Sequence, residues 1–498
     1  MNKQRFLAFI KAPEFILTLI LVVFFFKGVF LSVLFPFFQA PDEQTHYATI
    51  QQRAEPNEKT WTIKQGKDSS NGIDISTYHF SEETIQTAQK LQFDDVKFQK
   101  ENTQEFSQSD RGLHEDEIMS NNWKRYIDTY PANISGTISF YYSLGAKVEQ
   151  ILSDQSILTR LFSMRLLSVV MGVLIVFLAY LISQKIGFSK QNSLIITALV
   201  AFQPMFSASA SQVNIDIALI LAFSFYIYAS VSLLHSGMHW KDILLLILSL
   251  PLAFYSKGPG IVLFAITPFL LGYLIYKRFN ISLKKFSLYV SIAIFILVAV
   301  ITLSVPKSYF VSITNFNATS KFDSPVESLT KYIDKTINMT SVLRTEKSYW
   351  GNFGWLDTPL SGNIIQGIWI LEIIALFGIV LFFVPKRFLK KIRMGTEKSY
   401  LPEKKYILFF FGIMIALQLA IRFFDWRIFD AYKQILIGQP GRYFLPTIIP
   451  HIIVMAVGLG FFTRSKKQFD ILIKTLLVSM ILLSLHAMID VIIPRYYL

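Results

Sequence analysis

The sequence predicts an all-α integral membrane protein, a single polytopic domain over residues 1–498 with about eleven transmembrane helices. Hydrophobic residues make up 52% of the chain and charged residues only 16%, whereas a soluble chain carries about 25% charged residues. The apolar residues also fall into blocks of about 20, the length that a helix needs to cross the hydrocarbon core. The chain has no cysteine, which excludes disulfides, thiolate nucleophiles and cysteine-ligated metals.

The first apolar block runs from about residue 15 to residue 38, and three basic residues precede it. It is longer than the core of a signal peptide and ends in Phe-Pro-Phe-Phe, without a small-residue cleavage site. We therefore expect an uncleaved helix with its N-terminus in the cytoplasm. This orientation places Asp42, Glu43 and His46, which follow the block directly, on the outer face of the membrane.

A long polar segment, residues 37–158, follows the first helix and is expected to form the first extracytoplasmic loop. It holds 19 acidic and 11 basic residues, a net charge of −8, which leaves +22 for the rest of the chain. Ser81 is expected to cap a short helix that ends near Phe93. Apolar residues at helical spacing predict a further helix over 138–152, too short and polar to span, that lies along the membrane surface.

Ten further apolar blocks predict the remaining crossings. The stretch 242–276 permits either one long helix or a tight pair. One helix would move the basic run at 386–405 to the outer side, so the pair is favoured. The same alternation makes 306–362 a second large extracytoplasmic loop. The ten blocks lie at about 161–184, 192–212, 214–234, 242–256, 259–276, 286–305, 363–384, 406–422, 443–463 and 470–493.

The net charge of +14 is compatible with a nucleic-acid partner, but the positions of the basic residues favour a topology signal. Basic clusters fall in the loops that alternation assigns to the cytoplasm, above all in the basic cytoplasmic loop 386–405. No basic stripe, Gly-rich phosphate loop or dinucleotide fingerprint is present, so no nucleic-acid partner is expected. Richness in Phe, Ile and Lys without Cys indicates a bacterium, and hence a multi-pass protein of the bacterial cytoplasmic membrane.

The same alternation places four polar turns on the outer side, together with Asp42 and Glu43. Each turn combines a charge or an amide with Gly, Pro or aromatic residues in apolar surroundings. We expect these turns to line one cavity at the outer leaflet. Their polar and aromatic residues are Asn214 and Asp216, then Lys257, then Trp350 and Trp355, and finally Gln439, Arg442 and Tyr443.

Such a cavity has the groups needed for transfer from a lipid phosphate to a hydroxyl. A carboxylate can act as a general base and take a proton from the hydroxyl. Arg442 suits a phosphate oxyanion through a two-pronged contact, and Lys257 suits it as a point charge. The flat faces of Trp350, Trp355 and Tyr443 suit a sugar ring or a prenyl chain.

Four motifs occur in sequence on the expected outer side. The pattern resembles a family of bacterial multi-pass membrane proteins with a PDExxH motif. That family is grouped with the GT-C glycosyltransferases, which include the protein O-mannosyltransferases and the aminoarabinose lipid A transferase. No single motif is specific, but the four in order extend over most of the chain. They read Pro41-Asp42-Glu43-x-x-His46, Asn214-x-Asp216, Trp350-Gly351-x-Phe353-Gly354-Trp355 and Gly441-Arg442-Tyr443-x-x-Pro446.

The resemblance implies a GT-C-like fold, a polyprenyl-phosphate-linked sugar donor and a glycan or lipid-linked acceptor in the cell envelope. It implies that Asp42 is the base of an inverting displacement, and that Glu43 positions the acceptor or shares the proton. Arg442 would stabilise the departing polyprenyl phosphate. The family's late motif reads Gln-Gly-Arg-Tyr, whereas here Pro440 follows Gln439, which leaves the role of Gln439 open. The middle of the first loop, about 52–130, is expected to be a variable insert that carries acceptor choice.

Simpler explanations stay open for most of these residues. Asp42 and Glu43 fit a solvated loop, and Asn214 with Asp216 fits a helix cap. Lys257 fits snorkelling to the interface somewhat better than a role in binding, and the two tryptophans fit an interfacial aromatic belt as well as a substrate site. His46 fits a supporting role better than a metal ligand, because no second His stands at ligand spacing. No cofactor is expected; a divalent metal is compatible with the site but not indicated.

The sequence is also compatible with two other functions. A transporter or flippase of lipid-linked glycan would place polar groups at the bilayer midplane within internal repeats, whereas here they gather at one face. A non-catalytic scaffold for envelope assembly would need no intact cavity. The distance between Asp42 and Arg442 tests the site itself. Beyond about 15 Å the two side chains could not grip one sugar-phosphate group.

Overall fold

The structure is a computed structural model. It describes residues 12–54, 65–67, 74–76, 81–91, 93–99, 111–120, 139–279, 287–288, 291, 320–385, 398–435 and 440–498. Most of the predicted crossing at 286–305, most of the basic loop 386–405 and Gln439 lie outside these residues.

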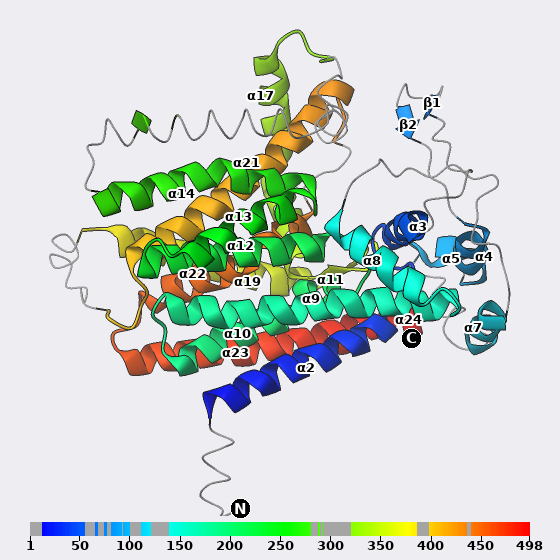
Figure 1. Ribbon diagram of the computed structural model, residues 1–498, viewed down its shortest axis with the longest axis horizontal. Helices are drawn as coiled ribbons and strands as arrows, with labels where there is room; N and C mark the ends of the chain where they lie inside the picture. Colours follow the sequence, from blue (N-terminus) through cyan, green and yellow to red (C-terminus); the bar gives the residue numbers. More distant parts are fainter. Residues whose placement is uncertain are drawn as a thin grey trace, which may run out of the picture.

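Eight helical segments in the described part are long and apolar enough to cross a membrane, which confirms the all-α, multi-pass prediction. Figure 1 shows most of the long helices running roughly side by side. Large apolar side chains are exposed on their outward faces, as a lipid-facing surface requires. The eight segments are α2 (Pro13–Leu34), α9 (Ile157–Lys185), α12 (Asp216–Ser236), Gly258–Phe279 with α14 (Val262–Phe279), α19 (Gly362–Phe383), α21 (Lys404–Tyr432), Gly441–Gly460 with α22 (Ile448–Gly460), and Lys466–Tyr497 with α23 (Lys466–His486).

Two expected crossings are shorter than the others. The block predicted at 192–212 divides into α10 (Lys190–Phe202) and α11 (Pro204–Ser209). Pro204 lacks the N–H that would continue α10, and the side chain of Gln203 accepts a hydrogen bond from Phe206 N and so caps α11. The other short helix is α13 (Trp240–Phe254).

The stretch 242–276 forms two helices, as the favoured prediction has it. Helix α13 ends at Phe254, and the turn η2 (Gly258–Ile261) leads into α14. A Cβ atom on Gly260 would lie 2.1 Å from the carbonyl oxygen of Ala253. Only glycine allows the chain to turn back this closely on the end of α13, and this turn carries Lys257.

The helices of the first loop, α3, α4, α5, α7 and α8, gather at one end of the bundle (Figure 1). The expected cap is confirmed: Ser81 accepts a hydrogen bond of 3.1 Å from Thr84 N at the start of α4. The helix expected over 138–152 is α8. The elements of the first loop are α3 (Glu43–Ala54), β1 (Gln65–Lys67), β2 (Asp74–Ser76), α4 (Glu82–Lys90), α5 (Phe93–Val96), α7 (Arg111–Ser120) and α8 (Phe140–Ile151), with β1 antiparallel to β2.

The described second-loop and C-terminal elements complete the fold. Helix α18 leads into an antiparallel pair, β3 and β4, in which Asn352 is paired with Pro359. Helix α23 continues through one π-helical stretch to the end of the chain. These elements are α17 (Pro325–Thr336), α18 (Met339–Trp350), β3 (Asn352–Phe353), β4 (Thr358–Pro359), η3 (Gly441–Thr447), η4 (Ala487–Ile492) and α24 (Ile493–Tyr497).

Part of the expected variable insert is anchored in the bundle. Arg160 of α9 is fully buried and forms ion pairs with Glu83 of α4 and Glu149 of α8. Arg495, near the C-terminus, donates a 2.7 Å hydrogen bond to the carbonyl oxygen of Val96. Residues 81–99 of the first loop therefore belong, where described, to the core packing around the site.

Candidate active site

Four charged side chains from distant parts of the chain meet at one end of the bundle. Arg442 Nη2 lies 3.6 Å from Asp42 Oδ2, and Arg442 Nε lies 3.9 Å from Asp216 Oδ2. Lys257 Nζ lies 2.5 Å from Asp216 Oδ1. The separation of Asp42 and Arg442 is far below the limit of about 15 Å for gripping one substrate group.

Asp42 is the most exposed member of this cluster. It begins the turn into α3 with a φ of 62°, a left-handed conformation that Asp adopts more readily than most residues. Its carbonyl oxygen accepts the N–H of His46 at 2.9 Å, so the backbone is fixed by the first turn of α3. The side chain is 54% exposed, compared with 12% for both Arg442 and Asp216. Its carboxylate is therefore open to a substrate while its backbone is held.

Glu43 points the opposite way, which corrects the expectation that it is a second catalytic carboxylate. Its side chain has no exposed surface and is paired with the equally buried Arg165 of α9, at 2.5 and 2.8 Å. The same carboxylate accepts the backbone N–H groups of Phe38 and Val213. With both oxygens occupied and no open space beside them, Glu43 ties the Asp42 turn to α9 and to the turn before α12.

Asn214 and Asp216 have different roles: Asn214 caps the start of α12, and Asp216 belongs to the charged cluster. Asn214 Oδ1 accepts the N–H of Ile217 at 3.1 Å, and its amide nitrogen donates to Ser209 O at 2.7 Å. Asn214 thus stabilises the start of α12 and the turn before it, as the simpler explanation proposed. Asp216 is the first residue of α12, where the helix dipole favours a carboxylate, and it faces Lys257 and Arg442.

Lys257 is held by two neighbours rather than extended into solvent. Besides its bond to Asp216, its ammonium group lies 4.0 Å from the ring centre of Tyr443, which is a cation–π geometry. Arg442 lies 5.4 Å from the centre of the same ring. The ring of Tyr443 therefore lies beside both cations of the cluster.

Arg442 is positioned by direct backbone packing of η3 on α18. A Cβ on Gly441 would lie 2.1 Å from Thr345 O and 2.3 Å from Tyr349 N, so only glycine fits. Gly441 N donates to Ser348 Oγ at 2.5 Å. The Nε of Arg442 is buried without a hydrogen bond in the structure. A buried donor without a partner, between two carboxylates that are too distant to bond it, favours an anionic ligand.

His46 supports the cluster from the next turn of α3. Its Nδ1 lies 2.7 Å from the hydroxyl of Tyr142 of α8. Burial lowers the pKa of His46 to about 4, against an opposing effect of Asp42 and Asp216. The imidazole is therefore neutral at pH 7 and adds no charge, so the two carboxylates and the two cations of the cluster balance.

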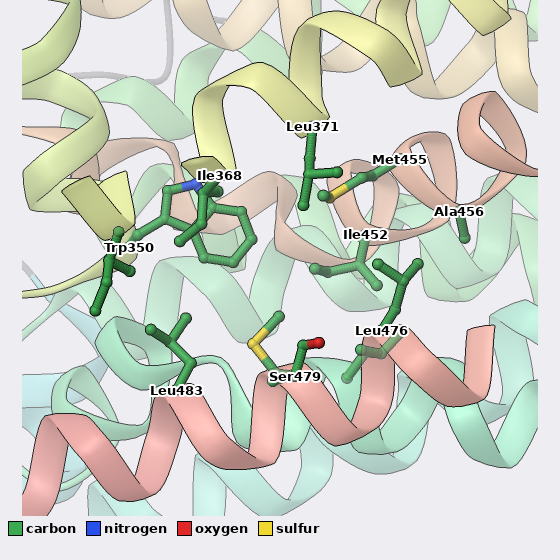
Figure 2. A pocket seen from close by; sticks show the side chains of 12 residues that line it. Trp350, Ile368, Leu371, Ile452, Met455, Ala456, Leu476, Ser479 and Leu483 are labelled. Carbon is green, nitrogen blue, oxygen red and sulfur yellow. The ribbon is translucent and has the colours of Figure 1, made fainter. Parts of the chain in front are cut away.

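The two tryptophans do not join the cluster, which corrects the expectation that both line the cavity. Trp350 is 1% exposed, and its indole N–H donates to Glu372 at 3.0 Å. It stands at one end of an apolar cavity of about 210 Å³ between α19, α22 and α23 (Figure 2). Trp355 donates to Phe38 O at 3.1 Å and carries the ammonium group of Lys97 over its ring at 3.6 Å. The sequence pattern did not predict the direction of the two rings.

Two residues that support the site were missed in the sequence. Arg165 fixes the Asp42–Glu43 turn, and Tyr142 fixes His46. The signal for Arg165 was present, since an Arg inside an apolar helix needs an acidic partner within the bundle. Tyr142 stands among several aromatic residues of α8 and gave no separate signal.

The cluster provides the exposed carboxylate of Asp42, the guanidinium of Arg442 with its unbonded Nε, and the ammonium group of Lys257, which Asp216 neutralises. Within the described residues, no group of three or more His, Asp or Glu side chains is arranged to hold a metal ion. The chemistry available to the residues themselves is proton abstraction by Asp42 and stabilisation of an anion by Arg442.

The chain matches one family model and is similar to several distant solved structures, among them two of an archaeal enzyme. The family model described as "Predicted membrane protein (DUF2142)" matches residues 24–451. The archaeal oligosaccharyltransferase AglB from Archaeoglobus fulgidus, in complex with an inhibitory peptide and a dolichol-phosphate, is similar at a TM-score of 0.46 and 13% identity. The apo form of the Archaeoglobus fulgidus oligosaccharyltransferase has a TM-score of 0.40 and 14% identity. Each comparison covers 97% of this chain and 56% of the archaeal one. No curated protein matches the chain in sequence.

Proposed function

Since the chain belongs to the predicted membrane protein family DUF2142, we propose that it is a membrane glycosyltransferase of the GT-C type. It moves a sugar from a polyprenyl-phosphate donor to a glycan or lipid-linked acceptor of the cell envelope. The site faces the outside of a bacterial cytoplasmic membrane. No metal or other cofactor is part of the proposal, and membrane lipid is the remaining partner.

One observation carries the proposal: a solvent-open carboxylate and an incompletely hydrogen-bonded guanidinium lie 3.6 Å apart at one end of a membrane bundle. Asp42 and Arg442 are separated by almost the whole chain, so this pairing requires the complete fold. A lipid-linked sugar phosphate needs both groups, since the acceptor must lose a proton while the phosphate gains charge. The order of the four motifs, which resembles that of a family grouped with the GT-C enzymes, supports the same assignment.

The proposed reaction is a single displacement. Asp42 takes the proton of an acceptor hydroxyl, and the acceptor oxygen forms a bond to the anomeric carbon. The bond from that carbon to the phosphate oxygen breaks, and its electron pair stays on the polyprenyl phosphate. Attack from the side opposite the leaving group inverts the anomeric configuration.

The cations have different parts in this scheme. Arg442 binds the departing phosphate, because its Nε is free and its Nη2 lies near the base. Lys257 remains with Asp216 and contributes its field rather than a direct bond. Asp216 thereby keeps the site close to neutral before the donor arrives and limits the cost of holding two cations in a partly buried place.

A reconstituted assay tests the proposal. Purified protein in phospholipid vesicles receives a polyprenyl-phosphate donor with a radiolabelled sugar, together with envelope glycan as acceptor. Transfer of label to the glycan supports the proposal. Movement of intact donor between leaflets would indicate a flippase, and neither activity would indicate a scaffold; either result contradicts the proposal.

Two variants make the assay specific to the site. Asp42→Asn keeps the shape of the side chain and removes its basicity, so we expect transfer to fall by about 10²–10⁴-fold. Glu14→Gln is the matched control, because Glu14 is an exposed carboxylate near the start of α2, with an ion pair to Lys190 at 3.2 Å. We expect the control to transfer sugar at the wild-type rate.

A further inference from the structure

Helix α17 has three distinct faces along its twelve residues. One face packs on the end of α21: Tyr332 donates to Asp425 at 2.9 Å, and Trp426 donates to Ser328 at 3.2 Å. A second face carries charges, including the exposed pair of Glu327 and Lys331 at 2.6 Å. The third face is apolar.

The apolar face is a continuous exposed stripe. Val326, Leu329 and Ile333 lie in α17, and Ile337 directly follows its last residue. The four recur at spacings of three and four residues, which places them along one side of the helix and its end. Their exposed fractions are 73%, 42%, 40% and 58%. Single exposed apolar residues are ordinary, but four in one row on a helix that is otherwise charged or buried are not.

The depth of α17 in the membrane follows from its attachment to α21. Helix α21 has 29 residues and is therefore about 43 Å long, longer than the hydrocarbon core of about 30 Å. Its final turns, to which α17 is bonded, reach the headgroup region at one side. Trp426 and Tyr432 lie in these turns, as aromatic residues do at membrane interfaces.

The orientation of α17 fits the same depth. Figure 1 shows α17 running across the direction of α9, α10 and α12 rather than along it. Because those helices cross the membrane, an element that runs across them extends along the membrane rather than through it. A helix in that orientation can turn one face to the bundle, one to lipid and one to water.

We propose that α17 is an interfacial helix that inserts Val326, Leu329, Ile333 and Ile337 into the lipid bilayer at the end of the bundle that holds Asp42 and Arg442. The apolar stripe and the charged face match the two sides of an interfacial helix. The occupant of the stripe is the acyl region of the leaflet, and Glu327 and Lys331 remain in water.

The position of α17 links the membrane surface to Arg442 through helix α18. Helix α17 ends at Thr336, and α18 begins at Met339. The far end of α18 supplies Ser348, which accepts the N–H of Gly441 next to Arg442. A helix seated in the leaflet therefore sets the starting point of the element on which the phosphate-binding segment packs.

The absence of cysteine from the chain allows a direct test by site-directed spin labelling. Single cysteines replace Val326 and Ile333 on the apolar face, and Lys331 and Asp334 on the charged face. All four side chains are exposed, so the substitutions leave the packing on α21 intact. Each labelled protein is reconstituted in phosphatidylcholine nanodiscs, and its collisions with oxygen and with a water-soluble nickel chelate are measured.

We expect the ratio of oxygen to nickel accessibility to be at least about threefold higher at positions 326 and 333 than at 331 and 334, because oxygen concentrates in the acyl region. Equal ratios at all four positions would overturn the proposal by placing the helix in water. Labels at 326 and 333 that are shielded from both reagents would also overturn it, since protein would then cover the stripe. A wild-type gel-filtration profile for each labelled protein shows that the variants are folded.

Discussion

Replacing Gly441 by alanine is the perturbation for which the structure gives the clearest magnitude. The added methyl would lie 2.1 Å from Thr345 O and 2.3 Å from Tyr349 N, whereas real contacts of a Cβ are at least 3.0 Å. The segment η3 must therefore move away from α18 by about 1 Å. Both obstacles are backbone atoms of a helix, so neither can rotate out of the way.

This displacement acts on the residue next to the methyl, Arg442. A misplacement of about 1 Å in a positioned group costs about 10²-fold in rate. We therefore expect Gly441→Ala to lower sugar transfer about 100-fold in the vesicle assay. Overpacking of this kind also costs about 1–3 kcal/mol in stability, so the melting temperature in detergent should fall moderately while the protein remains folded.

The matched control is Gly367→Ala in α19. A Cβ there meets no atom within 4 Å, and alanine is a better helix former than glycine by about 1 kcal/mol. The control should keep full activity and melt at the same or a slightly higher temperature. Wild-type transfer by Gly441→Ala would refute the claim that close packing of η3 on α18 positions Arg442.

Three further substitutions test buried titratable side chains of the protein, and a fourth, at Glu327, is a surface control. Glu43→Gln should destabilise the protein by about 3–5 kcal/mol in detergent unfolding, because it leaves Arg165 buried without its counter-charge. The control Glu327→Gln, at the surface, should leave stability nearly unchanged. Burial lowers the pKa of His46 to about 4 from 6.5, so wild-type stability should fall as pH drops through that window, and His46→Gln should flatten this part of the profile. Glu346 lies in α18. Burial and the carboxylate of Glu372 raise the pKa of Glu346 to about 9 from 4.5, so its neutral form is favoured and stability is lost as pH rises between these values; Glu346→Gln should remove that loss and melt higher at pH 8. An unchanged pH profile in either variant would contradict the assigned environment of that side chain.

The membrane helices were predictable because hydrophobic length and loop charge depend on local sequence. Eight of the expected blocks correspond to long apolar helices. The block at 192–212 was predicted as one crossing, yet Pro204 and the cap formed by Gln203 divide it. A proline inside an apolar run is a visible signal, and it outweighs hydrophobic length at that point.

The site was only partly predictable, since side-chain direction depends on tertiary packing. Adjacent carboxylates at the start of α3 look equivalent in sequence, but Asp42 is half exposed and Glu43 is fully buried. The difference arises from Arg165, more than a hundred residues later. Likewise, Asp216, the first residue of α12, faces the cations, while Asn214, in the turn before the helix, accepts the N–H of Ile217.

The central claim is that Asp42 and Arg442 have separate tasks at one site, base and phosphate holder. The most direct test compares Asp42→Asn with Arg442→Gln in vesicles, measuring donor affinity and single-turnover transfer separately. The structure predicts that Asp42→Asn binds the donor normally and transfers sugar about 10²–10⁴-fold more slowly, whereas Arg442→Gln loses donor affinity as well. Unchanged transfer by Asp42→Asn, or unchanged donor affinity in Arg442→Gln, would contradict the account.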